Sequence, residues 1–519
     1  MAAIIWEKDA LMENTFQLLK RHGSLHKVNI KYGYILFGVS ILLVALRTLA
    51  LWFYDKSWKK SSRSTTYLRL ARFPLALSMA VLVLAITFLM FVNPHLEKIS
   101  VLIKRTGRLS YALIPLDLFL AAQPAWFSID NYLDTIKLHK WVSRIIVTLG
   151  MLHGIGFFVY YIENNTLNKV FKFENLLGVV VFVLSPVIML MFKPVRSISY
   201  QFFYLFHTIF LMAMIFLIEY HARPGVGFFL FINICLLISQ YAKKYYYSKD
   251  ITMTEIVEHP GSDYKIVKFP KSLLPESYLP ASHVRIGYSK WSPLFVFLPS
   301  HPYTVATTYQ DHDLLSSLVI KPSKFQLQPF ETYSIIPVFK SSLSQNFFDT
   351  AENVSIVCGG SGISLGLGIF EYFKRCKVAD GRDIKLKFIW ITGKEDDLFI
   401  LNELNVQGVD IFVTSSDSDE LDAVQDAFVD SANDVSDIPL TNLPNESRDS
   451  FGSVLHKYEN VAVLGKRPNL EVMLRTNMSK TIDYANKWVI ACGPPSLISD
   501  CENIARQEKC RFFSEEYAF

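Results

Sequence analysis

Two stretches of equal length decide the fold: HKWVSRIIVTLGMLH, from His139 to His153, and HTIFLMAMIFLIEYH, from His207 to His221. Both are mostly apolar, which is typical of helices inside a membrane. In a helix, fourteen residues return to within about 40° of the starting direction and rise about 21 Å. Each histidine pair is therefore predicted to lie on one face of its helix, with one histidine towards each side of a bilayer.

The two stretches are separated by a single predicted span, so their helices run parallel. Equal spacing then sets His139 opposite His207, and His153 opposite His221. Two facing imidazoles, one on each side of the iron, are the ligands of a six-coordinate haem. Because both axial positions are filled, the two predicted haems would carry electrons. The residues alone also allow intramembrane polar pairs, a proton path or histidines at helix ends.

The rest of the composition separates two halves of the 519-residue chain, in which 51% of residues are hydrophobic, 19% are charged and the mean hydropathy is +0.26. The apolar excess lies before residue 243, where windows long enough to cross a bilayer predict seven spans. These spans are 32–54, 73–92, 109–127, 139–161, 175–192, 200–220 and 226–242. The net charge of +5, without a Lys/Arg block, indicates no nucleic-acid partner. Six cysteines without a CxxC pair indicate reduced thiols.

Basic residues in short loops predict the orientation of the bundle. The loop between the first two spans is rich in Lys and Arg, which places loops one, three and five and the C-terminal half in the cytosol. An opposing loop with Lys98, Lys104, Arg105 and Arg108 weakens this count.

Three other charged residues in or near the spans call for an interpretation. Asp117 lies in the third span and has no assigned partner. Arg144 and Arg223 lie near the histidines, where they would either pair with haem propionates or be ordinary interfacial arginines.

From about residue 250 the chain changes to short β-type runs between Pro and Gly, which predict a small antiparallel barrel. The barrel includes the tetrapeptide His301-Pro302-Tyr303-Thr304. An aromatic residue beside a hydroxyl at a strand start can stack on a flat ring and bond a phosphate. On its own, however, the tetrapeptide is more typical of an ordinary barrel strand.

After residue 350 the pattern becomes strand, glycine-rich turn and helix. An apolar strand runs into Gly359-Gly360-Ser361-Gly362, which favours a nucleotide-binding loop over a plain tight turn. A later strand ends in Cys492-Gly493-Pro494, where open α/β sheets bind ligands. The acidic stretch at 410–450 between them is predicted to be a solvated insertion.

With these motifs in this order, from about residue 100 to the C-terminus, the sequence resembles the ferric reductase transmembrane components grouped with the NADPH oxidases. HPYT is similar to the family's HPFT. The stretches NIKYGY, GRLSYALIPL, SHPYT, CGGSGIS and CGPPSL are most similar to a fungal branch of probable metalloreductases, named for altered inheritance of mitochondria. The resemblance implies haem ligation by His139, His153, His207 and His221, FAD binding by His301, Pro302, Tyr303, Thr304 and a C-terminal aromatic residue, Tyr517 or Phe519, and NADPH binding by Gly359, Gly360, Ser361, Gly362, Ile363, Ser364, Cys492, Gly493 and Pro494.

The expected architecture is a multi-pass α-helical membrane bundle followed by a ferredoxin-reductase-like module, with an antiparallel β-barrel FAD domain and an α/β nucleotide domain. The expected parts are an N-terminal segment 1–29, the first two spans in 30–99, the haem-binding spans in 100–242, the FAD domain 243–345 and the NADPH domain 350–519.

The expected function is transmembrane electron transfer from cytosolic NADPH through FAD and two b-type haems to an acceptor across the membrane. Ferric or cupric ions would make the protein a metalloreductase. Oxygen would make it a superoxide-generating NADPH oxidase with the same cofactors, and a haem-containing membrane protein without turnover is the third alternative. The membrane would be the plasma membrane or the endoplasmic reticulum. A homo-oligomer or an accessory subunit is left open.

Overall fold

The structure is a computed structural model of the chain. It describes residues 29–52, 75–92, 99–126, 132–223, 225–308, 314–322, 325–341, 343–414, 461–463, 467–477 and 486–515. The chain divides into two compact units, one of Met1–Tyr246 with Val296–Leu298 and one of Tyr247–Phe295 with Pro299–Phe519.

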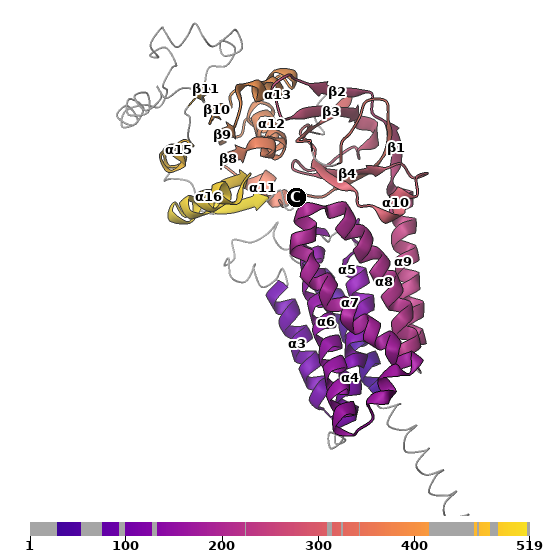
Figure 1. Ribbon diagram of the computed structural model, residues 1–519. Coiled ribbons are helices and arrows are strands. Elements are labelled where there is room, and N and C mark those ends of the chain that lie inside the picture. Colours follow the sequence, from indigo (N-terminus) through magenta and orange to yellow (C-terminus); the bar gives the residue numbers. More distant parts are fainter. Residues whose placement is uncertain are drawn as a thin grey trace, which may run out of the picture. The chain divides into compact units, whose positions relative to one another are not determined.

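The first unit is helical, and a described helix lies at each of the seven predicted spans (Figure 1). Four stretches are long and apolar enough to cross a membrane: Asn29–Trp52, Asp134–Glu163, Phe173–Leu190 and Tyr200–Ala222. The labelled helices are α3 (Leu75–Phe91), α4 (Ile99–Ala112), α5 (Ile114–Leu120), α6 (Tyr132–Glu163), α7 (Phe173–Ile198), α8 (Tyr200–Ala222) and α9 (Gly227–Tyr247), with a 3-10 turn at Leu167–Phe171.

The third span differs from its predicted bounds. Instead of covering 109–127, it begins at Ile99 as α4, breaks at Leu113 and continues as α5 to Leu120. The break comes just before Pro115, which has no backbone N–H to donate and stands in the first turn of α5. Hydropathy did not predict the start at Ile99, because α4 contains basic residues that lower its mean hydropathy although they lie inside the bundle. Arg105, only 1% exposed, donates to the carbonyl oxygens of Leu89 and Met90.

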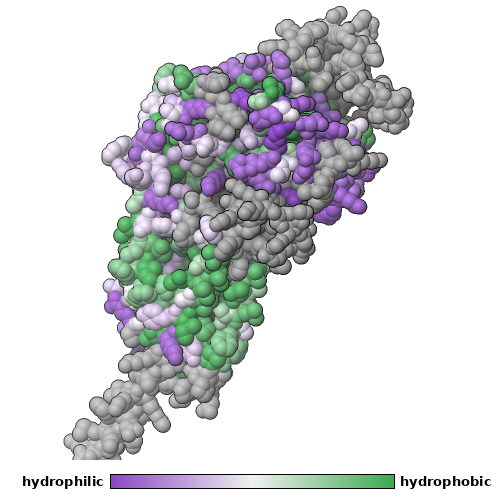
Figure 2. Space-filling view, turned by 180° about the vertical axis from the view of Figure 1, so that it is seen from behind, coloured by the Kyte–Doolittle hydropathy of each residue, from purple (hydrophilic) through white to green (hydrophobic). Residues whose placement is uncertain are grey.

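The outer surface of the helical unit is apolar. Figure 2 shows hydrophobic residues gathered over it. Large side chains stand exposed on several helices, among them Leu84 at 69%, Leu190 at 74% and Phe231 at 66%. Such a continuous apolar surface fits a bilayer rather than water. The predicted membrane bundle is thus confirmed.

The second unit begins with two antiparallel sheets that form the predicted barrel. One sheet has the strand order β1-β7-β4-β5 and the other β2-β3-β6. A shared apolar core, which includes Phe269, Val284 and Leu318, lies between them. The strands are β1 (Lys249–Thr252), β2 (Glu255–Glu258), β3 (Lys265–Pro270), β4 (His283–Tyr288), β5 (His301–Thr304), β6 (Leu315–Ile320) and β7 (Thr332–Phe339), with short helices at Lys271–Leu273 and Leu294–Phe297 (α10).

A six-stranded sheet follows, in the order β11-β10-β9-β8-β12-β13, and all its pairings are parallel. Its strands are β8 (Asn353–Gly359), β9 (Lys385–Thr392), β10 (Asp410–Val413), β11 (Val461–Val463), β12 (Lys487–Cys492) and β13 (Arg511–Glu515). The described helices are α11 (Gln345–Thr350), α12 (Ile363–Ala379), α13 (Phe399–Glu403), α15 (Leu470–Asn477) and α16 (Pro495–Gln507), with 3-10 turns at Gly360–Gly362 and Glu395–Leu398.

The strand order of this sheet reverses between β8 and β12. From β8 the chain builds outwards through β9 to β11 on one side, and then returns to build β12 and β13 on the other. Open α/β sheets bind ligands at such a switch point, outside the carboxyl ends of the strands. The acidic stretch was predicted to begin at residue 410, but Asp410–Val413 form β10, with Ile411 and Val413 buried. The rest of the stretch lies in the connection from β10 to β11, of which residues 415–460 fall outside the described residues.

Candidate functional site

The four histidines form two pairs between α6 and α8. The rings of His139 and His207 have centroids 6.4 Å apart and planes at 82°. The rings of His153 and His221 have centroids 6.0 Å apart and planes at 79°. We call His139 and His207 the inner pair, because they lie towards the end of the bundle where α8 begins and α9 ends, and His153 and His221 the outer pair.

Both ring separations fit an iron held between two imidazoles. Each ring would contribute a metal–nitrogen bond of about 2 Å and about 1.2 Å from that nitrogen to the ring centre. Two such rings on opposite sides of the metal have centres about 6.4 Å apart. The observed 6.4 and 6.0 Å lie at or close to this value. The sequence spacing, carried by two uninterrupted helices, thus brings each pair to the distance that a bis-histidine haem requires.

The outer histidines are supported in the same way on two different helices. His153 Nδ1 lies 2.7 Å from the carbonyl oxygen of Ile103 in α4, and His221 Nδ1 lies 2.8 Å from that of Glu174 in α7. Four residues after each carbonyl stands a glycine against the ring. A Cβ on Gly107 would lie 2.7 Å from His153 Nδ1, and one on Gly178 would lie 2.6 Å from His221 Nδ1.

Sequence reasoning missed these two glycines. The only signal was a glycine inside an apolar helix, which often marks a close approach. Their absent side chains make room for the rings, and the carbonyl acceptors leave Nε2 of each histidine for a metal.

The inner pair has a different support. His139 Nδ1 lies 2.9 Å from a carboxylate oxygen of Asp117 and 3.2 Å from its carbonyl oxygen. The hydroxyl of Ser143 lies 2.9 and 2.8 Å from the two carboxylate oxygens and donates its single proton to this carboxylate. The charge that the sequence left without a partner therefore belongs to the inner histidine.

The two arginines considered as propionate partners make other contacts. Arg223 lies 3.4 Å from the carboxylate of Glu219 and over the ring of Tyr220. Arg144 lies over the ring of Trp141, 4.7 Å from its centroid. These contacts agree with interfacial arginines.

The HPYT tetrapeptide is β5, at the edge of its sheet. His301 stacks on Phe325 with centroids 4.3 Å apart, and its buried Nε2 has no hydrogen-bond partner among the described residues. Tyr303 packs beside the barrel core. An edge strand keeps backbone groups for a ligand, and a buried ring nitrogen needs a partner, so the strand fits a flavin.

A buried cation behind this strand was not predicted. Arg285 on β4 is 6% exposed and lies opposite Pro302 on β5. Its Nε donates to Ser300 Oγ at 2.9 Å. Burial, followed by the charge of Arg285, lowers the pKa of His283 to about 3 and that of His301 to about 4. Both imidazoles are therefore neutral at physiological pH. A charged residue within the apolar strand HVRIGY was the available signal.

The two predicted nucleotide loops meet at the switch point of the parallel sheet. β8 and β12 are neighbours, with Cys358 paired to Cys492. Gly360 has a φ of +57°, which favours glycine, and a Cβ on Gly493 would lie 3.1 Å from the backbone nitrogen of Gly359. The close approach leaves backbone groups at the strand ends for a ligand.

The end of the first loop turns away from this edge. Ile363 is fully buried in the core shared with the barrel, and Ser364 donates to the carbonyl oxygen of Val319 at 3.0 Å. These two residues join the barrel to the nucleotide domain. The two C-terminal aromatic residues considered for FAD, Tyr517 and Phe519, lie outside the described residues.

Glu515 is a further titratable group at the switch point. It is the last residue of β13 and pairs with Cys492 on β12. Burial raises the pKa of its carboxyl to about 7 and also raises the pKa of the Cys492 thiol. No disulfide joins any of the six cysteines, all of which lie among the described residues. Near neutral pH, therefore, this edge holds a carboxyl that can exchange a proton beside a protonated thiol.

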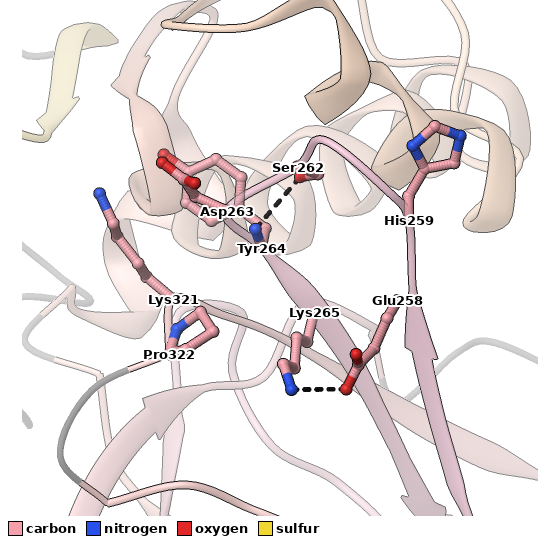
Figure 3. Close-up of a pocket in the computed structure, with 8 residues that line it drawn as sticks. All are labelled: Glu258, His259, Ser262, Asp263, Tyr264, Lys265, Lys321 and Pro322. Atoms are coloured by element: carbon pink, nitrogen blue, oxygen red, sulfur yellow. Dashed lines mark hydrogen bonds and ion pairs between the residues drawn. The ribbon is translucent and has the colours of Figure 1, made fainter.

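A pocket of about 390 Å³ opens at the β2–β3 turn (Figure 3). Tyr264 links it to the nucleotide loop, since a Cβ on Gly360 would lie 2.7 Å from the Tyr264 hydroxyl. Opposite charges share the pocket, and its Lys265 is paired with Glu258. Its lining residues are Glu258, His259, Ser262, Asp263, Tyr264, Lys265, Lys321 and Pro322.

Three family models match consecutive parts of the chain. The ferric reductase like transmembrane component matches residues 106–218, an FAD-binding domain matches 250–334, and the ferric reductase NAD binding domain matches 351–506. The protein is therefore an integral membrane oxidoreductase with FAD- and NAD(P)-binding domains.

Relatives cover nearly the whole chain. The probable metalloreductase AIM14 of Scheffersomyces stipitis is 34% identical, over 96% of this chain and 97% of its own. That of Zygosaccharomyces rouxii is 34% identical, over 97% and 99%, and that of Kluyveromyces lactis is 33% identical, over 96% and 99%. The chain belongs to this family of fungal probable metalloreductases, as the motifs predicted.

Solved structures are more distant. A flavohemoglobin from Malassezia yamatoensis with bound FAD and heme is 9% identical, with a TM-score of 0.35 over 95% of this chain and 98% of its own. The Amycolatopsis cytochrome P450 reductase GcoB is 11% identical, with a TM-score of 0.34 over 52% and 70%.

Proposed function

We propose that the protein carries electrons from cytosolic NADPH, through FAD and two b-type haems, to ferric or cupric ions on the other side of the membrane. The observation that carries this proposal is the pair of ring separations between α6 and α8, 6.4 Å for His139 and His207 and 6.0 Å for His153 and His221.

A bound b-type haem supplies reversible one-electron chemistry at its iron. His139 and His207 would hold one haem, and His153 and His221 the other. Because two histidines would hold each haem iron, they would leave it no open position for a substrate. The histidines thus favour electron transfer through the bundle over chemistry within it.

For FAD, we propose β5 as the binding strand, with His301, Pro302, Tyr303 and Thr304 and the C-terminal Phe519. The neutral His301 ring offers Nε2 as a hydrogen-bonding group, and Arg285 supplies positive charge behind the strand. Its cation would favour the negative charge of the FAD pyrophosphate.

For NADPH, we propose the two loops at the switch point. They consist of Gly359 to Ser364 and Cys492 to Pro494; Gly360 to Gly362 and Gly493 would offer backbone N–H groups at the carboxyl edge of the sheet, and Ile363 and Ser364 would anchor the first loop. Lys394 stands just after β9, where such folds place the group that contacts the 2′-phosphate, and its ammonium, which is paired with Asp263 at 2.8 Å, would have to turn from this partner to the phosphate. Lys394→Gln is expected to lower the ratio of kcat/KM for NADPH to that for NADH. An unchanged ratio would count against Lys394.

The orientation rests on charge. Of the four basic residues assigned to the opposing loop, Lys104, Arg105 and Arg108 belong to α4. Removing them from the loop count strengthens the inference that the C-terminal half is cytosolic. The plasma membrane and the endoplasmic reticulum are both compatible with this orientation, and membrane fractionation distinguishes them.

The acceptor is tested with purified full-length protein in liposomes. NADPH is expected to reduce b-type haem and to yield a ferrous or cuprous chelate that superoxide dismutase does not suppress. A product that superoxide dismutase abolishes would make the protein an oxidase, and haem that NADPH leaves oxidised would exclude both enzymes.

The ligands are tested in the same preparation. His207→Ala is expected to remove one of two haems and to stop haem reduction. Ile209→Ala, a half-exposed position on the same helix, is the matched control and is expected to retain both haems. Full haem content in His207→Ala would sink the ligand assignment.

A further inference from the structure

We propose that Asp117 holds the redox potential of the inner haem below that of the outer haem and so gives electron flow its direction. This inference rests on the proposed function, because it requires a haem at each histidine pair. Asp117 would touch no cofactor; it would act as a positioning residue through His139.

The contacts of Asp117 form a closed arrangement between α5 and α6. One carboxylate oxygen lies 2.9 Å from His139 Nδ1, and the Ser143 hydroxyl lies 2.9 and 2.8 Å from the two carboxylate oxygens. The carbonyl oxygen of His139, 2.9 Å from the same hydroxyl, is an alternative acceptor for its single proton. The side chains of His139 and Asp117 are only 16% and 13% exposed. The carboxylate is thus fixed on the ring nitrogen that faces away from the partner histidine.

Within the described part of the bundle, the outer histidines have no such anion at Nδ1. His153 and His221 each meet a neutral backbone carbonyl there, that of Ile103 at 2.7 Å and that of Glu174 at 2.8 Å. The two pairs therefore differ in the charge of the group that accepts the Nδ1 proton of a ligand, while their ring separations differ by little.

A carboxylate acceptor changes the iron as well as the ring. When Nε2 binds a metal, Nδ1 keeps its proton and donates it, and a charged acceptor makes a stronger hydrogen bond than a carbonyl. The imidazole becomes a more basic ligand. A more basic ligand stabilises the ferric ion over the ferrous ion and lowers the redox potential.

A lower potential at the inner pair makes forward transfer favourable. With both haems bound, one electron would pass from the haem held by the inner pair, which would be oxidised, to the haem held by the outer pair, which would be reduced, and no bond would form or break. The reverse transfer is disfavoured by the same difference.

The experiment is a spectroelectrochemical titration of the solubilised holoprotein, which resolves one step for each haem. Asp117→Asn keeps the size and an acceptor oxygen but removes the charge. We expect the midpoint potential of the lower step to rise by at least about 59 mV, which for one electron is a tenfold change in the ratio of reduced to oxidised haem. The midpoint potential of the other step is expected to stay unchanged. Equal movement of both steps, or of neither with haem content intact, would overturn the proposal.

Two further variants keep the result interpretable. Ser143→Ala removes a hydroxyl from the same carboxylate but leaves its charge, so no upward shift is expected; an upward shift as large as that of Asp117→Asn would mean that packing, not charge, sets the potential. His153→Ala removes the outer haem and leaves Asp117 untouched. Its remaining haem is expected to have the lower of the two wild-type potentials, and finding the higher one would overturn the proposal even if Asp117→Asn fails to fold.

The spectrum and the redox titration of the wild-type protein distinguish failure of this inference from failure of the proposed function. A wild-type protein with fewer than two bis-histidine haems would refute the proposed function. Two such haems with the inner one at the higher potential would refute only the role of Asp117.

Discussion

Replacing Gly107 by alanine tests how the outer haem site is built. The new Cβ would lie 2.7 Å from His153 Nδ1 and 2.9 Å from its Cε1, whereas ordinary contact begins at 3.4 Å. The ring would have to move by about 0.7 Å, the difference between the last and the first of these distances, away from its acceptor on Ile103. Such overpacking typically costs about 1–3 kcal/mol, or roughly 5- to 140-fold in the equilibrium for holding the ring in place.

The assay is the haem content of the purified protein, followed by its redox titration. Gly107→Ala is expected to lose haem from the outer pair and to retain the inner haem. Gly150→Ala is the control within the same bundle, since its Cβ would meet only Ser110 Oγ at 3.7 Å. Two haems per chain with unchanged potentials in Gly107→Ala would refute the reasoning, and equal losses in both variants would mean that any added methyl group disturbs the bundle.

Three further predictions concern stability of the second unit in the full-length protein. Burial raises the pKa of Glu515 from 4.5 to about 7, so the folded state keeps a proton that the unfolded chain releases. The stability from this group is complete below pH 4.5 and falls as the pH rises to about 7, so Glu515→Gln is expected to flatten the decline in melting temperature over that range. Gly362→Ala sets a Cβ 2.5 Å from the carbonyl oxygen of Cys492 and is expected to cost about 1–3 kcal/mol in denaturant unfolding. Gly393→Ala is its control, since the added Cβ would have no heavy atom of the described residues within 4 Å beyond its chain neighbours. Phe347→Ala empties a fully buried core site and is expected to cost about 3–5 kcal/mol in the same measurement.

Each of these predictions has a contrary result. A Glu515→Gln variant that keeps the wild-type slope would mean that another group titrates. Equal stability of Gly362→Ala and Gly393→Ala would contradict the close approach between the two predicted nucleotide loops. A loss of unfolding free energy below about 1 kcal/mol for Phe347→Ala would mean that the core collapses around the gap.

The sequence was sufficient for the histidine pairs because a spacing of fourteen depends only on helix periodicity. It was also sufficient for the barrel and for the two loops at the switch point, since glycine and proline mark strand ends. The third span was harder to predict. Its basic residue Arg105 donates hydrogen bonds to carbonyl groups of a neighbouring helix. A hydropathy window covers only adjacent residues and cannot take account of acceptors elsewhere in the chain.

The supports of the histidines were out of reach for the same reason. Asp117 and Ser143 are 26 residues apart, and Ile103 and His153 are 50 apart. Only the packing of α4 and α5 on α6 brings them together. The sequence was therefore sufficient to pair the histidines, whereas the groups that contact their Nδ1 atoms emerge only from helix packing.

The strand order of the nucleotide domain has a practical consequence. The connection that contains residues 415–460 leaves β10 and returns at β11, at the outer edge of the sheet and away from the β8–β12 boundary. Length changes there leave the register of the central strands untouched. A fluorophore or affinity tag inserted into this connection would report on the protein in living cells while the cofactor-binding edge keeps its geometry.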